Sequence, residues 1–346
     1  MDNVKKAVQS IGAPRLIIFG LFLSLCFGAV SLGLPMSDLM SAALVRMGMN
    51  GILVLAMVPG ILCGIGLNFG IPIGIVCGLI GGLISIELDL YGITAFLVAV
   101  MISIPLSLIA GWGYGLLLNR VKGSEMTVAT YAGFSIVSFM CIFWLIAPFK
   151  SLELKWPIGT GLRTTITLTG RYASVLDNFL AFKIFGVTIP TGLLLFFGFM
   201  CFLMQIFLRS KIGIGMSTAG DNPRFAKASG INVDNKRLLG TMVSTMCGAI
   251  GIIVYSQSYG FYQLYTAPLM MGFAAVAAIL IGGASAKRAT ILHVVLGTFL
   301  FQGLLTIALP VANKIVTEGN LSEVLRMIVQ NGVILYALTK MGGESK

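Results

Sequence analysis

Long apolar runs recur along the whole of this 346-residue chain. Each run holds about 18 or more residues, which is enough for a helix to cross a lipid bilayer. Hydrophobic residues make up 57% of the chain and charged residues only 10%, against roughly 25% charged residues in an ordinary soluble domain. Open sheet edges cannot be satisfied in lipid, and the alternating pattern of a barrel is missing. The sequence therefore predicts an all-α polytopic membrane protein.

The charge distribution predicts how the chain is oriented. A net charge of +11 would suggest nucleic acid as the partner of a soluble protein, but in a membrane protein Lys and Arg collect on cytoplasmic loops. With both termini in the cytoplasm, 15 of the 23 Lys and Arg residues fall on that side. We expect a multi-pass protein of the bacterial inner (plasma) membrane with no nucleic-acid partner. Its single membrane domain, 1–346, should have about ten spans, at roughly 16–34, 43–61, 66–86, 92–118, 127–148, 190–208, 239–258, 268–284, 290–310 and 323–341.

Two long polar segments interrupt the apolar runs. The segment 149–189 contains Trp156, Pro157 and Gly-Thr turns, and the orientation makes it an extracytoplasmic excursion with partial helix near Val175–Phe182. The segment 209–237 is basic and falls in the cytoplasm.

A short helix is predicted inside the cytoplasmic segment 209–237. Asp221 or Asn222 is a suitable N-cap, Pro223 suits the first helical position, and Gly230 is placed to end the helix. A helix this short is not stable alone. Its deliberate caps therefore indicate contact with a partner at the membrane surface.

The third predicted span carries a glycine at every fourth position. Small residues at this spacing let another helix backbone approach closely. Two interpretations stay open: tight packing within the chain, and a pore-lining or subunit-contact role. The series comprises Gly66, Gly70, Gly74, Gly78 and Gly82.

Neutral polar side chains interrupt several spans. Amides are costly in lipid unless they are paired, so they are expected to face the interior of the bundle. They either form hydrogen bonds between helices or line a path for an uncharged, hydroxylated solute, and both interpretations stay open. Asn68 and Gln257 are the foremost candidates for such a path. The whole candidate set is Asn68, Phe69, Gln257, Tyr259 and Gln302.

Motifs for catalysis, metal binding or energy conversion are missing from the sequence. No Asp or Glu lies in the middle of a predicted span, although ion-coupled carriers ordinarily use one. The chain has no Walker phosphate loop, no zinc-protease motif and no Cys-x-x-Cys pair, and His293 is its only histidine. We expect no catalytic residue, no metal site and no cofactor in this chain. The chain is predicted to form a path for a solute and to depend on another protein for energy. It is not expected to be an enzyme.

Several segments resemble one family. Ala219–Ile231 (AGDNPRFAKASGI) resembles the A-x-G-x-N-P-x-A-A-x-x-S-G-I loop of the permeases of ATP-binding-cassette importers, in the ribose, autoinducer-2, nucleoside and branched-chain amino acid group. Leu208–Gly213 resembles the R-x-x-x-G stretch that precedes this loop. Ala274–Ser285 (AAVAAILIGGAS) and Leu296–Thr298 resemble two further segments of the family. The likeness is good over 190–340 and looser over 42–125.

The resemblance implies a type II ABC importer-like permease fold and a set of partners. The short cytoplasmic helix would be the coupling helix, which docks in a groove of a separate ATPase that holds ATP and Mg. A second permease, identical or related, and an extracytoplasmic solute-binding protein would complete the importer. The residues that the family motif places at the ATPase are Asp221, Asn222, Pro223, Arg224, Phe225, Ala226, Lys227, Ser229 and Gly230.

The chain departs from the family pattern at two places. Gly66 and Asn68 stand where sugar-type members carry an acidic residue and a serine, and 286–289 reads AKRA where the family is rich in glycine. The N-P…S-G-I form nevertheless favours a simple sugar or a nucleoside over an amino acid as the solute. Arg224 and Lys227 suit either an acidic groove of the ATPase or anionic lipid. A stand-alone secondary transporter or channel, a membrane-embedded enzyme and a non-transport scaffold stay open as alternatives.

Overall fold

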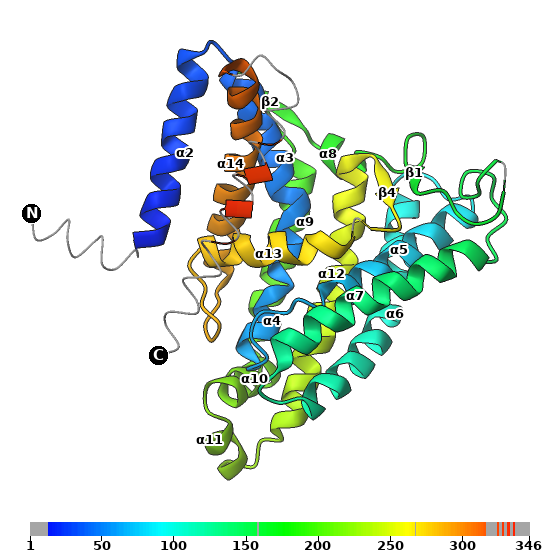
Figure 1. Cartoon of the computed structure of the whole chain (residues 1–346), viewed down its shortest axis with the longest axis vertical. Coiled ribbons are helices and arrows are strands. Elements are labelled where there is room, and N and C mark those ends of the chain that lie inside the picture. The colour runs from blue at the N-terminus through cyan, green and yellow to red at the C-terminus, as the bar shows by residue number, and fades with distance from the viewer. Residues whose placement is uncertain are drawn as a thin grey trace, which may run out of the picture.

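Helices dominate the computed structural model (Figure 1). The structure describes residues 13–157, 159–266 and 268–315, with a few single positions between 324 and 335. Its short helices are α8 (Val175–Asn178), α10 (Lys211–Asp221) and α11 (Pro223–Ala228). Its longer helices are α2 (Ala13–Ser31), α3 (Met36–Leu55) with its continuation α4 (Met57–Leu62), α5 (Ile71–Glu87), α6 (Gly92–Arg120), α7 (Glu125–Ile146), α9 (Thr191–Arg209), α12 (Val233–Tyr259), α13 (Pro268–Ile281) and α14 (Ile291–Ile315).

The helices follow the predicted spans closely. Within the described residues, six are long and apolar enough to cross a membrane, namely α3 with α4, α6, α7, α9, α12 and α14. Shorter apolar helices, α2, α5 and α13, coincide with three more predicted spans. The predicted span at 323–341 lies outside the described residues, apart from single positions. The chain is a multi-pass helical membrane protein.

The core of the bundle is built around α12. This helix packs against α3, α5 and α6, and α5 is buried along almost its whole length. Glycines permit the closest of these approaches: a methyl group on Gly74 or Gly78 of α5 would overlap the carbonyl oxygen of Thr245 or Ala249 on α12. Two backbones in such contact gain dispersion energy that lipid tails cannot replace.

The glycine series does not lie on one helix, which corrects the predicted start of the third span. Residues 63–70 form a buried turn, in which Gly64 and Gly66 have φ of +79° and +88°. Such positive angles suit glycine and end a helix. Pro72 then occupies the first turn of α5, where its missing N–H costs nothing. Gly66 and Gly70 therefore lie outside the helix, against Met126 and Tyr114.

Within the described residues, four short strands depart from the predicted all-α fold. β2 (Phe182–Ile184) and β3 (Val187–Ile189) form a hairpin, while β1 (Thr165–Thr167) pairs with the distant β4 (Phe261–Gln263). All four lie outside the helices, so they do not expose strand edges within the apolar part of the bundle. The predicted partial helix near Val175–Phe182 forms as α8.

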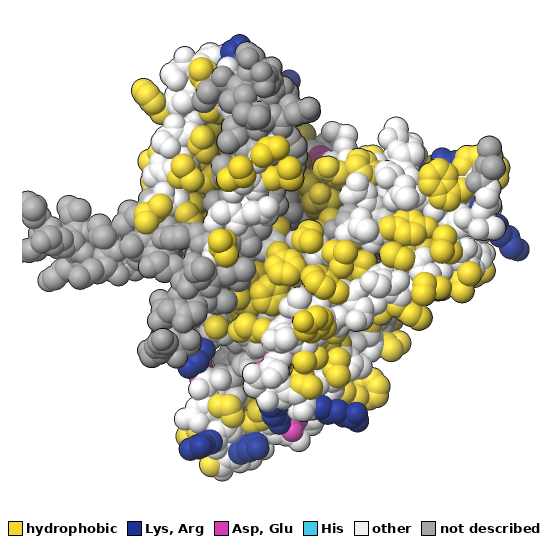
Figure 2. All heavy atoms as spheres, in the orientation of Figure 1, with side chains coloured by type: hydrophobic (Ala, Val, Ile, Leu, Met, Phe, Trp, Pro, Cys, Tyr) yellow, Lys and Arg dark blue, Asp and Glu magenta, His cyan; other side chains and the backbone are white. Residues whose placement is uncertain are grey.

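The two polar segments lie at opposite ends of the molecule (Figure 1). α10 and α11 project at one end, whereas β1, β4 and α8 lie at the other. Figure 2 shows Lys and Arg side chains gathered at the α11 end and hydrophobic side chains along the flank between the two ends. This is the arrangement expected for a bundle whose middle lies in lipid.

Candidate coupling site and the adjoining helix break

Helix α11 is capped at both ends by residues within the segment. The side-chain Oδ1 of Asn222 accepts a hydrogen bond from the N–H of Phe225 at 3.0 Å, and Pro223 occupies the first turn. At the other end Gly230 has a φ of +76°. Its N–H donates to the carbonyl of Lys227, and the N–H of Ile231 donates to the carbonyl of Ala226. These two bonds form a Schellman motif, which satisfies the last carbonyls of the helix. Asn222, rather than Asp221, is the N-cap.

One small side chain fastens α11 to the rest of the molecule. Ala226 is fully buried against Ala219 of α10 and Val233 of α12. Arg224, Phe225 and Lys227 are exposed, as are the neighbouring positions of the predicted ATPase-coupling set, with Phe225 59% exposed. An exposed aromatic ring between two cations, on a helix capped at both ends, is suited to a pocket in a partner protein.

Helix α10, which precedes α11, contacts the turn 63–70. This turn separates α4 from α5 and is called the helix break below. A methyl group on Gly220, near the end of α10, would overlap the carbonyl oxygen of Leu62 and the backbone nitrogen of Gly64. A cavity of about 180 Å³ adjoins this contact, between the 63–64 turn, Pro223, Lys227 and Arg237. The end of α10 is therefore in backbone contact with the start of the turn 63–70.

Ion pairs hold the loop between α6 and α7 to the start of α12. Arg237 donates to Glu125 at 2.5 Å, and both side chains are largely buried. Lys122 pairs with Asp234 nearby, but both of these side chains are about half exposed. A buried, hydrogen-bonded pair fixes geometry more firmly than an exposed one. At the α11 end of the bundle, the start of α12 is therefore fixed to the loop between α6 and α7.

Asn68 is the centre of a buried hydrogen-bond network at the break. Its Nδ2 donates to the hydroxyl of Ser244 at 2.8 Å, and its Oδ1 accepts from the Tyr114 hydroxyl at 2.8 Å and from the N–H of Gly70 at 2.9 Å. Ser244 in turn donates to the carbonyl of Ala56, where α3 gives way to α4. The Asn68 amide thus links the turn 63–70 to α6 and α12. These bonds agree with the first of the two interpretations, hydrogen bonding between helices. A path role for Asn68 stays a prediction.

Gln257 makes a second network at the far end of α12. Its Oε1 accepts from the N–H of Leu176, and its Nε2 donates to Asp177 at 3.1 Å and to Ser258. Burial raises the pKa of the Asp177 carboxyl, against hydrogen bonds from Ser258 and Gln257 that lower it. Gln257 lies 13 residues from Ser244, about 20 Å along the helix. The foremost two path candidates are therefore far apart.

The other path candidates occupy separate places. Gln302 is buried in α14. Tyr259 is 45% exposed and stacks on Tyr255, with ring centroids 5.3 Å apart. Phe69 forms an aromatic cluster at the break with Phe273 of α13, which also contacts Phe134 of α7, at centroid distances of 5.3 and 6.2 Å. The candidates do not converge on one site within this chain.

Arg171 organises the excursion in a way that the sequence did not single out. Its guanidinium contacts both carboxylate oxygens of Glu153 at 3.0 Å and Asp89 at 2.7 Å, and it lies 4.1 Å over the Tyr91 ring. The hydrogen bonds to Glu153 raise the pKa of Arg171, and the bonds from Tyr91 and Arg171 lower that of Asp89. The signal available in the sequence was a cation, Arg171, with the acidic residues Asp89 and Glu153 earlier in the chain. Which of these residues pair could be seen only in the folded structure. In the described part of the chain, no three metal-ligating side chains come together.

Together these features define a polytopic membrane protein that presents a capped, exposed helix beside a break in its membrane helices. The chain belongs to the family described as "Branched-chain amino acid transport system / permease component", whose model matches residues 11–338. This membership confirms the resemblance seen in the sequence.

One curated relative is the "Tyrosine transport system permease protein" of Clostridioides difficile (strain R20291). It is 28% identical over 161 residues, which are 44% of this chain and 51% of that protein. The chain thus aligns with about half the length of this relative, whose name gives no support to the predicted sugar preference. No solved structure matches the chain.

Proposed function

We propose that the chain is the transmembrane permease subunit of an ATP-binding-cassette importer. The observation that carries this proposal is α11, a helix capped at both ends that presents Arg224, Phe225 and Lys227 and is braced against the helix break. A separate ATPase would bind α11 and hold ATP and Mg. A second permease, identical or related, and an extracytoplasmic solute-binding protein would complete the importer in the bacterial inner membrane.

The proposed mechanism has two states. Closure of the ATPase dimer displaces α11, and the contact between Gly220 and Leu62 passes the displacement to the turn 63–70. The Asn68 network then transmits it to α6 and α12, so that the spans change the side to which the path opens. A packed bundle of this kind is bistable rather than continuously deformable, which suits alternating access.

The proposed cargo is a small polar solute that contains a ring. The family motif favours a simple sugar or a nucleoside. The relative named for tyrosine and the Phe69, Phe134 and Phe273 cluster add an aromatic amino acid as the second candidate, since aromatic surfaces stack well on planar rings. Competition for uptake among tyrosine, a nucleoside and a simple sugar distinguishes the three.

Replacement of the exposed ring tests the coupling role. We expect Phe225→Asp to lower co-purification with the ATPase at least about tenfold, because exposed aromatic anchors dominate such interfaces, and to abolish uptake. Phe185→Asp is the matched control, since Phe185 is a fully exposed ring at the opposite end of the molecule. Unchanged ATPase association in Phe225→Asp would contradict the proposal. Solute flux by the purified chain alone in liposomes would instead establish a stand-alone transporter or channel.

A further inference from the structure

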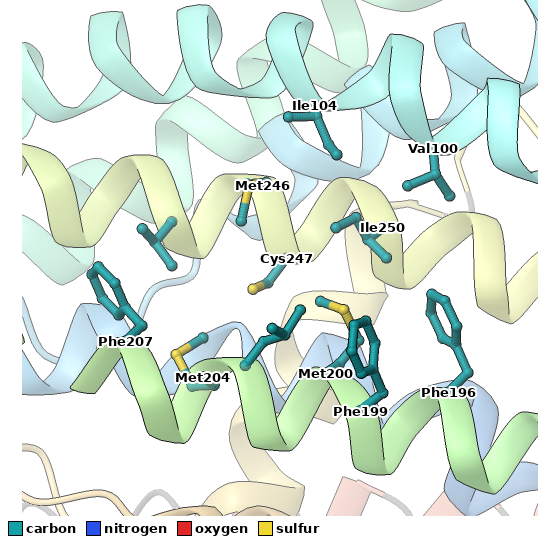
Figure 3. A pocket seen from close by; sticks show the side chains of 12 residues that line it. Val100, Ile104, Phe196, Phe199, Met200, Met204, Phe207, Met246, Cys247 and Ile250 are labelled. Atoms are coloured by element: carbon teal, nitrogen blue, oxygen red, sulfur yellow. The ribbon is translucent and has the colours of Figure 1, made fainter. Parts of the chain in front are cut away.

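An apolar cavity of about 410 Å³ lies between α6, α9 and α12 (Figure 3). Side chains of α9 and α12 point toward one another across it, among them Met200, Met204, Met246 and Cys247. Every lining residue is Phe, Met, Leu, Ile, Val or Cys. The volume is within the range of about 300–1,000 Å³ of ligand sites, yet no polar side chain is present to hold a polar solute.

The cavity is closed at one end and open at its side. Near the excursion, Phe96 of α6 and Phe196 of α9 meet edge to face, with ring centroids 5.5 Å apart. Toward the α11 end, the lining continues to Phe207 of α9 and Val243 of α12. Phe199 and Leu203 are both more than 40% exposed, so the cavity opens to the surroundings of the bundle. These three helices are candidate membrane spans, so an opening along their sides would face lipid.

Positive charge lies at the α11 end of the same cavity. Lys211 follows Phe207 by four residues, just past the end of α9, and Lys236 precedes Val243 by seven residues on α12. Seven residues are two helical turns, so Lys236 lies on the Val243 face, about 10 Å nearer the membrane surface. The Lys236 side chain extends over Gly215 of α10. Gly215 follows Lys211 by four residues, about one helical turn. None of the ion pairs in the described part of the chain engages Lys211 or Lys236.

We propose that this cavity is a binding site for an anionic phospholipid of the leaflet at the α11 end. One acyl chain lies between α9 and α12, and the phosphate lies between Lys211 and Lys236. An apolar helix, from this chain or from a second copy, would fill the cavity but would bring no anion to the two lysines. The bound lipid would set the separation of α9 from α12, and α9 leads directly into α10 and α11.

Lipid retention by the purified full-length chain tests the site. After delipidation and addition of lipid, native mass spectrometry should show phosphatidylglycerol retained about tenfold more than phosphatidylcholine with the same acyl chains, because cations near a surface favour anionic lipid. Met200→Trp, which fills the cavity, should abolish this retention. The matched control Phe202→Trp changes an exposed ring on the lipid-facing side of α9 and should leave it unchanged.

A second variant removes any dependence on core packing. Lys211→Glu with Lys236→Glu alters two side chains that are not fully buried, and should remove the preference for phosphatidylglycerol while the chain stays folded. The proposal would be overturned by equal retention of both lipids by the wild type, by unchanged retention in Met200→Trp, or by a second copy of the chain bound in place of lipid. Equal thermal stabilisation by soluble glycerol phosphate would also overturn it, because the acyl chain would then be unnecessary.

Discussion

Gly74 illustrates how a single missing side chain positions two helices. A methyl group there would overlap the Thr245 carbonyl oxygen of α12, which as backbone cannot move aside. We expect Gly74→Ala to lower the free energy of unfolding by about 1–3 kcal/mol, the usual cost of overpacking.

Gly113 provides the matched control for this substitution. It lies on the exposed face of α6, and no atom lies within 4 Å of the position that an added methyl group would occupy. Gly113→Ala should therefore stabilise the helix by about 0.5–1 kcal/mol. Thermal unfolding of the two purified variants measures both effects. A stability of Gly74→Ala equal to that of the wild type would show that α5 and α12 are not in this contact.

Asp177 gives the excursion a dependence on pH. Burial raises its pKa above the ordinary value of 3.8, so the folded state binds a proton more readily than the unfolded state does. Its contribution to stability is therefore fully present below pH 3.8 and is lost as the pH rises through the folded pKa. Asp177→Asn keeps the acceptor oxygen for Ser258 and Gln257 without the charge.

We accordingly expect Asp177→Asn to be more stable than the wild type at about pH 7, and the difference to vanish as the pH approaches about 4 and below. Unfolding temperatures measured from about pH 4 to about pH 8 check this. A wild-type advantage at neutral pH would mean that the carboxylate charge has a stabilising partner.

At the scale of elements, α11 depends on its caps. Replacing a capping Asn by Ala costs about 1 kcal/mol, which corresponds to about fivefold in an equilibrium constant. We expect Asn222→Ala to expose the amides of 223–229 to hydrogen exchange and to weaken ATPase association about fivefold, whereas Asn222→Ser keeps a capping oxygen and should behave like the wild type. Equal loss in both variants would indicate a direct contact of the Asn222 amide with the partner.

The same element shows which features can be predicted from sequence. The cap joins residues three positions apart, so Asn222, Pro223 and Gly230 suffice to predict α11. The turn 63–70 is different, because a buried turn between two helices is as apolar as a helix. The glycine spacing therefore extended the third span too far, to Gly66.

Features that join distant residues could not be predicted. Asn68 meets Tyr114 and Ser244 across 46 and 176 positions, respectively, and β1 pairs with a strand almost 100 residues later. Each partner alone is an ordinary polar residue in an apolar run. Only packing of the whole bundle brings these residues together, which also explains why the path candidates could be named but not assembled into a site.

At the scale of the whole molecule, α12 links the two ends. It starts beside α11, carries Arg237 and Ser244, and near its other end places Gln257 against α8. With 27 residues it is about 40 Å long, which exceeds the hydrocarbon thickness of about 30 Å. The segment 209–237, which contains α11, and the excursion 149–189 are therefore far enough apart to lie on opposite faces of a membrane.

The orientation of these two ends can be tested by labelling. Eight Lys and Arg against three Asp and Glu occupy 119–125 and 209–237, so the positive-inside rule predicts that α11 lies in the cytoplasm. We expect an impermeant thiol reagent to modify Phe185→Cys in intact cells, and Lys227→Cys only in inverted vesicles. The six native cysteines are buried or half-buried, so the unsubstituted chain should give a low background. Modification of both positions from the same side would refute the placement of α11 and the excursion on opposite faces, and with it the proposed contact between α11 and a cytoplasmic ATPase.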